Sequence, residues 1–443
     1  MSSSFLEKEF LNQIDKENQL NDKSKGINTI QSMLDPRFHS IINRSKLFSK
    51  TNQIHPKQNS KSSNINSNPI TNSISKNALS STCKSRLQGL LIGLGMTVIT
   101  LAILLAVFLT RSSSTTTTST TSTCNTLSWN STGITIIGNG SNGFSLNQLN
   151  NPGDVFIGND DTIYIADTSN HRILSINISS INNGTYYGNV IAGITNTPGT
   201  SSQTLKNPKG IYVDSDKNLY IADTNNCRVQ YWRYGSSNGS TVAGNANGSP
   251  GAALDKLSQP YAVYVDQSKN IYVSDTGNGR IVQWISGNSS GILVTGNASS
   301  GFSSNQLALP VDIIVDSQNQ IIYIANFNAH TIVSWTIGKT AGTILLGTNS
   351  TKGNSPSLFQ YPFGLIRDTY GNLYVSDLFN HRVQMFCLNG TSFSSGKVIA
   401  GTGISQFSSI DLSFPSGIAF DSQMNLYVAD SGNHRIQKFS RIQ

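Results

Sequence analysis

The sequence has few charged residues and few cysteines for its length. Asp, Glu, Lys and Arg make up 12% of its 443 residues, about half of the usual share of about 25%. This argues against a helical coiled coil or helical solenoid, which would be rich in Glu, Lys, Leu and Ala. Four cysteines are too few for a scaffold held together by many disulfides. The abundant residues are Asn, Ser, Thr and Gly, which favour an all-β protein with many turns.

The positive charge of the chain is concentrated at its N-terminal end. Residues 1–88 contain 13 Lys and Arg against 6 Asp and Glu, whereas the remaining 355 residues contain 18 and 17. The larger part is therefore nearly neutral. The overall charge of +8 gives no reason to expect a nucleic-acid partner.

A long apolar segment divides the two parts. The 22 residues Gly89–Thr110 contain no charge, and about 20 apolar residues span a bilayer. Lys76, Lys84 and Arg86 precede the segment, and only Arg111 follows it closely. The positive-inside rule then predicts a single-pass, uncleaved anchor with a cytosolic N-terminus. We expect the rest of the chain outside the cell membrane, or in the lumen of the secretory pathway.

The flanking regions agree with that topology. Residues 1–88 are Asn-, Ser- and Lys-rich and predict a disordered basic cytosolic tail. The Ser/Thr run Ser112–Thr123 predicts a stalk over residues 111–130. Glycosylation motifs follow the anchor, and the candidate acceptors are Asn130, Asn139, Asn177, Asn183, Asn238, Asn288, Asn297, Asn349 and Asn389.

From Leu149 onward the chain repeats itself at intervals of 50 to 56 residues. In the last copy, short strands are predicted at Gly417–Phe420, Asn425–Asp430 and His434–Phe439, and each spacer contains a fourth. Four antiparallel strands without room for a helix form a β-propeller blade. The repeat prolines are Pro152, Pro208, Pro260, Pro310, Pro362 and Pro415.

The ring can be closed by a strand from the N-terminal side. The chain ends at Gln443, after the third strand of the last copy, and Gly133–Gly138 precedes the first copy like an orphan fourth strand. We expect this strand to complete the last blade, because pairing removes two exposed sheet edges. The fold class is therefore all-β, a closed six-bladed propeller over residues 131–443.

Three motifs of the repeat resemble a known family. The last copy contains Pro-Ser-Gly-Ile at 415–418, Asn-Leu-Tyr-Val-Ala-Asp at 425–430 and Asn-His-Arg-Ile-Gln at 433–437. Together they resemble the NHL repeat. The resemblance implies a six-bladed NHL-type propeller.

An aspartate and an arginine recur five residues apart, around the turn between the second and third strands. The fourth copy has Asn326 and Thr331 instead, and this joint loss indicates a structural pair. We expect the aspartate to accept backbone N–H groups in the turn, and the arginine to bridge locally or to the next blade. The pairs are Asp167 and Arg172, Asp223 and Arg228, Asp275 and Arg280, Asp377 and Arg382, and Asp430 and Arg435. Histidines at 171, 330, 381 and 434 occupy one repeated position, so they should not converge on a metal.

The position after each repeat proline differs between copies, at one mouth of the central channel. Lys209, Tyr261 and Phe363 are therefore candidate binding residues. One position further on, Asp154 and Asp312 belong to opposite blades. They could hold calcium or a similar cation through water, or could be solvated or cap a turn. No other cofactor and no catalytic residue is predicted.

The cysteines after the anchor are odd in number. Cys124 lies in the expected stalk, Cys227 in the second copy and Cys387 in the fifth. Because the second and fifth blades are opposite, Cys227 and Cys387 should not pair. Cys124 could then form an intermolecular disulfide and dimerise the stalk.

Several functions occur on related propellers. Peptidyl-amidoglycolate lyases place zinc-binding histidines directly after repeat prolines, and none occurs there in this sequence. Metal-dependent lactonases use a channel cation, which leaves a hydrolase or lyase as the alternative function. RNA-binding NHL proteins have a basic face, which this nearly neutral region lacks. The preferred interpretation is an extracellular module of receptor, adhesion or sensor type that binds a protein, peptide or glycan.

Overall fold

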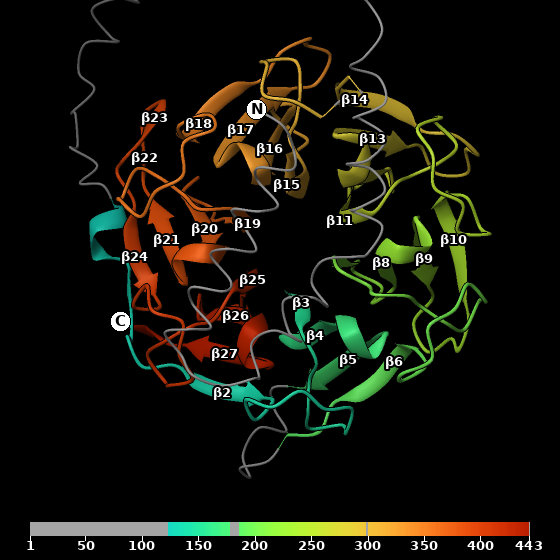
Figure 1. Cartoon of the computed structure of the whole chain (residues 1–443), viewed down its shortest axis with the longest axis horizontal. Coiled ribbons are helices and arrows are strands. Elements are labelled where there is room, and N and C mark those ends of the chain that lie inside the picture. The colour runs from blue at the N-terminus through green and yellow to red at the C-terminus, as the bar shows by residue number, and fades with distance from the viewer. Residues whose placement is uncertain (1–122, 178–185, 298–299, 443) are drawn as a thin grey trace, which may run out of the picture. The chain divides into compact units, whose positions relative to one another are not determined.

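The computed structural model describes residues 123–177, 186–297 and 300–442. They form six four-stranded antiparallel sheets around a central axis (Figure 1). The predicted all-β fold with six blades is therefore confirmed. The tail at 1–88 and the anchor at 89–110 lie outside the described residues. In the described part, every helix is too short and too polar to cross a bilayer.

Each blade runs from an inner strand to an outer strand (Figure 1). The first, inner strands are β3 (Pro152–Ile157), β7 (Ile211–Val213), β11 (Pro260–Val265), β15 (Pro310–Asp316), β19 (Pro362–Arg367) and β25 (Pro415–Phe420). The second are β4 (Thr162–Asp167), β8 (Leu219–Asp223), β12 (Ile271–Asp275), β16 (Ile321–Asn326), β20 (Leu373–Asp377) and β26 (Leu426–Asp430). The third are β5 (Arg172–Asn177), β9 (Arg228–Trp232), β13 (Arg280–Trp284), β17 (Thr331–Thr336), β21 (Arg382–Phe386) and β27 (Arg435–Phe439). The fourth are β6 (Asn189–Gly193), β10 (Gly239–Gly244), β14 (Ile292–Gly296), β18 (Thr343–Gly347), β24 (Lys397–Ala400) and β2 (Ile134–Ile137).

The second strands form the most buried layer of each blade. Every residue of β8, β12, β20 and β26 is buried, because these strands are covered by the blades on both sides. Their Val, Ile and Tyr side chains suit such strands. The repeated tyrosine joins one blade to the next: Tyr164 of blade one packs in one cluster with Ile211 and Leu219 of blade two.

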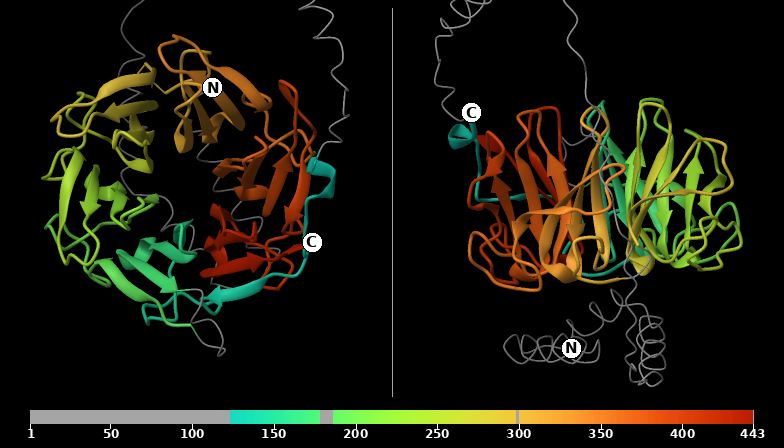
Figure 2. Two further views of the ribbon diagram at one scale, coloured as in Figure 1. Left: turned by 180° about the vertical axis from the view of Figure 1, so that it is seen from behind. Right: turned by 90° about the horizontal axis from the view of Figure 1, so that it is seen from above.

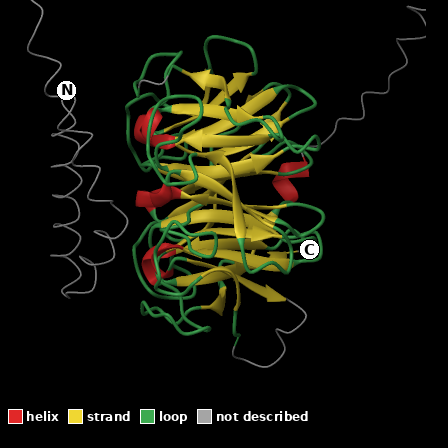
Figure 3. Ribbon diagram, turned by 90° about the vertical axis from the view of Figure 1, so that its right-hand side faces the viewer, coloured by secondary structure: helices red, strands yellow, loops and turns green. Residues whose placement is uncertain are grey.

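A single turn of 3-10 helix joins the second and third strands of each blade. The residue that ends each turn has a left-handed backbone, with φ between 50° and 62°. These turns lie on one face of the propeller (Figure 3), which we call the proline face because the loops ending in the repeat prolines reach the first strands there. They are η2 (Thr168–Asn170), η4 (Thr224–Asn226), η5 (Thr276–Asn278), η6 (Phe327–Ala329), η7 (Leu378–Asn380) and η8 (Ser431–Asn433). The other face carries the remaining hairpins.

The N-terminal strand closes the ring, as predicted. Strand β2 pairs with β27, with Ile134 opposite Lys438 and Ile137 opposite Ile436. A second, unpredicted pairing follows at the edge of the ring, where β1 (Ser128–Trp129) pairs with β28 (Arg441–Ile442). Both ends of the described chain are thus held in sheets.

A disulfide fastens the same N-terminal segment to blade five. Cys124, in the short helix η1 (Thr123–Thr126), is bonded to Cys387, which follows β21. Both cysteines are buried. The expectation that Cys124 dimerises the stalk is wrong for this structure, because its sulfur is already paired within the chain. Cys227 is a buried free thiol.

The segment from Cys124 to Trp129 belongs to the propeller and not to the expected stalk. The Trp129 ring stacks on Phe420 of blade six and meets Tyr374 of blade five edge-on, with 5.7 Å between ring centres in each case. Its indole N–H donates to the Met424 carbonyl at 2.8 Å. This segment therefore covers the joint between the last two blades. A small hairpin of β22 (Leu388–Asn389) and β23 (Ser392–Phe393) lies beside it in blade five.

The helix η1 lies on the face opposite the proline face. In Figure 3 one short helix stands apart from the others, across the disc. The connectivity agrees, because β21 begins next to η7 on the proline face and ends just before Cys387. Thr123, where the described residues begin, therefore lies on the face away from the repeat prolines. Figure 2 shows the disc and this teal segment from the side.

Replacing both Cys124 and Cys387 by Ser should destabilise the propeller. The disulfide closes a long loop between positions 263 residues apart, and a bond of this kind contributes about 2–4 kcal/mol. Urea unfolding of the full chain in detergent should show this loss. Reducing agent should reproduce it in the wild type and leave the double variant unchanged. A wild-type dimer on non-reducing electrophoresis that disappears when Cys124 alone is replaced by Ser would contradict the intrachain bond.

Candidate functional site

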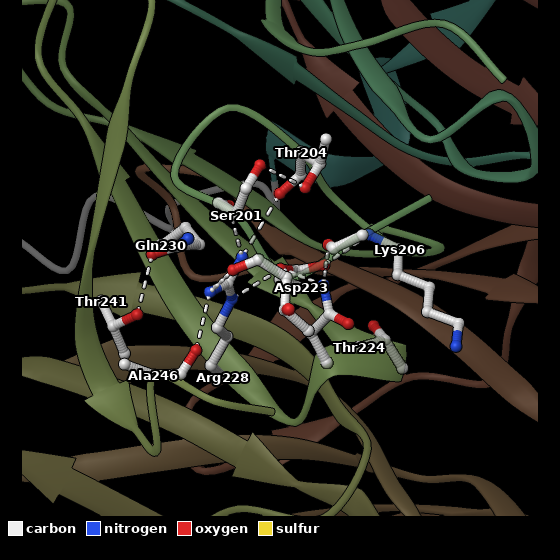
Figure 4. A network of polar contacts seen from close by, with 12 residues as sticks. Ser201, Thr204, Lys206, Asp223, Thr224, Arg228, Gln230, Thr241 and Ala246 are labelled. Carbon is white, nitrogen blue, oxygen red and sulfur yellow. Dashed lines mark hydrogen bonds and ion pairs between the residues drawn. The ribbon is translucent and has the colours of Figure 1, made fainter. Parts of the chain in front are cut away.

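A buried ion pair stands at the start of the third strand of blade two (Figure 4). The Asp223 carboxylate accepts from Arg228 Nε at 2.8 Å and from the Asn226 side-chain amide at 2.8 Å, both on Oδ2. Its Oδ1 accepts the backbone N–H of Lys206 at 2.7 Å. The Asp223 side chain is 0% exposed and the Arg228 side chain 2%. The charges are thus buried, paired and hydrogen-bonded.

The arginine holds the loop that leads into its own blade. Its Nη1 donates to the carbonyl of Thr200 at 2.8 Å, and its Nη2 donates to those of Ser201 and Thr204 at 3.2 and 3.3 Å. The expectation that the aspartate binds N–H groups within its turn was wrong. It accepts an N–H from this incoming loop, 17 residues earlier in the sequence. The aspartate and arginine together fix the loop that precedes the repeat proline.

The same arrangement recurs in four other blades. The Nε–Oδ2 distances are 2.8 Å for Arg172 and Asp167, 2.6 Å for Arg280 and Asp275, 3.0 Å for Arg382 and Asp377, and 2.7 Å for Arg435 and Asp430. In blade four Asn326 Oδ1 still accepts the loop N–H of Ala308, at 2.7 Å. Thr331 replaces the arginine there and is fully buried. In blade four, Asn326 thus makes the same bond to the loop backbone as the aspartates do, but there is no ion pair.

The repeated histidines connect neighbouring blades. Each accepts, on Nδ1, the backbone N–H of the residue just before the next blade's proline. The pairs are His171 with Asn207 at 3.1 Å, His330 with Tyr361 at 3.2 Å, His381 with Phe414 at 3.2 Å and His434 with Asn151 at 3.1 Å. The four imidazole rings therefore connect four different pairs of neighbouring blades. Among the described residues there is no group of three or more His, Cys, Asp or Glu that could hold a metal.

Asp154 and Asp312 also connect blades, close to the channel. Asp154 accepts the N–H of Val155 at 2.8 Å and that of Ile211, in blade two, at 3.0 Å. Asp312 accepts the N–H of Ile313 at 2.8 Å and that of Leu365, in blade five, at 2.7 Å. Each carboxylate oxygen therefore has a backbone donor.

Burial disfavours the charged form of both carboxylates. It raises the pKa of Asp312 to about 7. The pKa of Asp154 is also well above its usual value, first through burial and then through the negative charge of Asp312. Two carboxylates that already accept backbone N–H groups, and whose charged forms are disfavoured by burial, are a poor donor set for a hard cation, which needs six to eight oxygens. The two residues do not fit the predicted cation site.

The residues after the repeat prolines form what we call the proline-face mouth: Gly153, Lys209, Tyr261, Val311, Phe363 and Ser416. Three of them contact one another there. The Lys209 ammonium lies 5.7 Å from the centre of the Tyr261 ring, a cation–π distance. The Tyr261 and Phe363 rings, from blades three and five, are 6.1 Å apart. All three side chains are partly exposed.

The mouth has two unlike halves. Blades one and six contribute Gly153 and Ser416, both buried. A Cβ at Gly153 would come within 2.6 Å of Thr168 Oγ1 and 3.2 Å of Lys209 Cδ, so a larger residue would displace the lysine. The opposite half holds the large rings. The partly exposed side chains of the mouth therefore come from blades two, three and five.

An aromatic cluster extends this half and was not predicted. In blades one, two and three, a threonine after the second strand donates to the next blade's proline carbonyl, as Thr168 does to Pro208 at 2.7 Å. Phe327 and Leu378 take that place in blades four and five. Phe327 lies 6.2 Å from Phe363 and 4.8 Å from Tyr361, between ring centres. The break in the Thr pattern was the sequence signal for this cluster.

Two grooves lie between blades, away from the mouth. One, of about 750 Å³, runs along β6 and is lined by Tyr164, Lys217 and Tyr234. The other, of about 490 Å³, lies between blades two and three beside Asp214 and Lys269. In each, a lysine is paired with an aspartate of the neighbouring blade: Lys217 with Asp160 at 2.8 Å and Lys269 with Asp214 at 2.9 Å. Their charged groups therefore already have partners.

Blades one, two and six match a known family of repeats. The NHL repeat model matches residues 149–174, 205–231 and 412–439. These ranges contain the inner strands of blades one, two and six together with the aspartate and histidine positions described above. The chain is therefore a six-bladed β-propeller with NHL repeats.

Comparisons with individual proteins show distant likeness. The chain is 24% identical over 266 residues to the chloroplastic protein SUPPRESSOR OF QUENCHING 1 of Arabidopsis thaliana, covering 52% of this chain but 24% of that protein. A structural-genomics protein of unknown function from Bacteroides thetaiotaomicron has a TM-score of 0.53 at 15% identity, over 70% of this chain and 76% of that one. An auxiliary nutrient binding protein from Bacteroides ovatus has a TM-score of 0.52 at 14% identity, over 72% and 78%. These structures share the fold.

Replacing Arg228 by Thr should strongly destabilise the protein, because it leaves the Asp223 charge buried without its partner. The expected loss of unfolding free energy is about 3–5 kcal/mol. The double variant D223N/R228T reproduces the residues of blade four and should lose less than R228T alone. Urea unfolding would measure both. A double variant that loses the sum of the two single losses would show that the charges do not act as a pair.

The hydrogen bond from Asn151 to His434, which connects two blades, should weaken in acid. Burial lowers the pKa of His434 to about 4, below the usual value of about 6.5, and its bond to Asn151 needs an unprotonated Nδ1. The bond should therefore contribute fully above about pH 6.5 and be lost as the pH falls towards 4. His434→Ala should lower the melting temperature more at about pH 7.5 than at about pH 4. Equal losses at both values would contradict this assignment.

Proposed function

We propose that this protein is a ligand-binding propeller, displayed outside the cytosol by a single-pass membrane anchor, and that the proline-face mouth is its binding site. The observation that carries the proposal is the divergence of the mouth in an otherwise uniform ring. Five blades share the buried ion pair, yet no two residues at the mouth position are the same. Positions that are free to differ while the frame is kept are the usual place for binding.

The disulfide supports the proposed compartment. Disulfides such as that between Cys124 and Cys387 form and persist in oxidising environments and are rare in the cytosol. The proposed anchor would place the propeller in such an environment. The free thiol of Cys227 is buried, which protects it from exchange there.

The candidate glycosylation sites are accessible, as the same compartment requires. Asn183 lies outside the described residues, and the asparagines at the other candidate positions are exposed. Those at 177, 238, 288 and 389 lie at or near hairpins of the face opposite the mouth. Glycans there would leave the mouth uncovered.

The position of η1 supports presentation of the mouth. The chain joins the propeller on the face opposite the repeat prolines (Figure 3). An anchor attached through this segment would leave the proline face directed away from its own attachment point. The mouth could then be reached by a ligand in solution or on another surface.

The alternative is an enzyme with a channel cation, such as a lactonase-like hydrolase or a lyase. Asp154 and Asp312 would have to bind that cation. Their oxygens already accept four backbone N–H groups, and burial raises the pKa of both. The binding function therefore agrees better with the residues in the channel.

Small molecules that bind the mouth should stabilise the wild type and not a mouth variant. We suggest thermal-shift measurements on the full chain in detergent with a panel of amino acids, aromatic acids, sugars and lactones. A hit should lose its effect in Y261A/F363A and keep it in I344A, which truncates an exposed side chain (45%) on an outer strand. Lactone hydrolysis with added calcium or zinc should stay at the buffer rate. Metal-dependent hydrolysis that is abolished by D154N would support the enzyme instead.

A further inference from the structure

Lys209 carries a charge that no residue described by the structure neutralises. Its ammonium forms no hydrogen bond or ion pair with any described residue, and its neighbour is the Tyr261 ring at 5.7 Å. Burial lowers the pKa of Lys209 to about 8, so the surroundings disfavour the charge. By contrast, the grooves between blades pair Lys217 and Lys269 with carboxylates. Lys209 is partly exposed as a residue, and its ammonium has no counter-ion among the described residues, so it is suited to an anion from outside.

The surface beside this ammonium is aromatic. Tyr261 and Phe363 lie 6.1 Å apart, and Phe327 is 6.2 Å from Phe363 and edge-on to it. The three rings are partly exposed and belong to one apolar cluster that also contains Val311. Such rings offer edge and face contacts to another planar ring.

The same residues limit the kind of anion. Lys209 is the only cation among the six mouth residues, so a single negative charge is matched and a phosphate or polyanion is not. The ring half of the mouth consists of the aromatic side chains of Tyr261, Phe327 and Phe363. A neutral sugar needs several polar partners. One charge next to an apolar ring surface is the complement of an aromatic carboxylate.

We propose that the proline-face mouth binds a carboxylate attached to an aromatic group, with the carboxylate at Lys209 and the ring against Tyr261 and Phe363. This inference rests on the proposed function, because it assigns a ligand class to the same site. Two sources share the chemistry: a free aromatic acid, or a peptide that ends in an aromatic residue.

The test compares a charged ligand with its neutral counterpart on the full chain in detergent. Phenylacetate and N-acetylphenylalanine represent the two sources, and phenylacetamide and N-acetylphenylalaninamide are their uncharged counterparts. Calorimetry or saturation-transfer NMR would give the affinities. The acids should bind at least roughly tenfold more tightly than the amides, as expected for one charge-assisted hydrogen bond. The tighter of the two acids identifies the source.

Variants separate the charge from the ring surface. K209M should reduce the affinity of the acids to that of the amides, and K209R should retain the preference for acids. Y261L and F363L should weaken acids and amides alike. K206M is the matched control, because Lys206 lies three residues earlier on the same loop and outside the mouth, and it should change nothing.

Three outcomes would overturn the inference. They are equal binding of acids and amides to the wild type, acid binding that K209M does not reduce, and no acid binding at millimolar concentration. The proposed function fails separately, if no compound of the wider panel depends on Tyr261 and Phe363. A neutral ligand that needs both rings but not Lys209 would sustain the proposed function and refute this inference.

Discussion

In five of the six blades, an ion pair between the last residue of the second strand and the first residue of the third determines where the blade begins. In blade two, Asp223 holds the N–H of Lys206 and Arg228 holds the loop carbonyls before it. Lys209 follows three residues later, so its place at the mouth depends on this buried pair. Burying two charges costs several kcal/mol each unless they are well paired. Here the paired charges hold a long loop in one conformation, and Lys209 of the mouth lies at the end of that loop.

The asymmetry of the mouth follows from where the repeat departs from its pattern. Blade four lacks the ion pair, and Phe327 replaces the threonine that would bond to the next proline carbonyl. Leu378 makes the same replacement in blade five. Apolar contacts therefore replace the threonine bond on one side of the ring, where Tyr361 and Phe379 pack with ring centres 5.0 Å apart. The aromatic half of the mouth adjoins this part of the ring. The blades that keep the repeat pattern form the regular part of the ring, and blades four and five, which depart from it, contribute aromatic side chains beside the mouth.

The sequence predicted the six blades and their strands because the patterns that specify them are local and recur in each copy. Strand order, the six blades and the closing strand at Ile134–Ile137 follow from spacing and alternation. The partner of Cys124 could not be predicted from the sequence, because the disulfide joins positions 263 residues apart. It also depends on β1 and β28, two short strands without a recognisable sequence pattern. Asp154 and Asp312 looked like a cation site because their backbone donors, Ile211 and Leu365, belong to other blades. Residues that form hydrogen bonds across the boundary between two blades have no fixed spacing in the sequence from which the bond could be predicted. The repeat predicted that the residues after the prolines lie at the start of the inner strands, but the contacts between the Tyr261, Phe363 and Phe327 rings depend on the closed ring.

The bond between Cys124 and Cys387 also determines how the propeller bears mechanical load. Tension on the chain before Cys124 passes through a covalent bond into blade five, at the end of β21, before it reaches β1 or β2. Strand β21 lies between β20 and β24, so the load is shared by the hydrogen bonds on both of its edges. A ring closed by β2 alone would open under tension as β2 peeled away from β27 one bond at a time. Here the closing strand lies outside the path of the force, and the ring can be pulled from its attachment point without being unzipped.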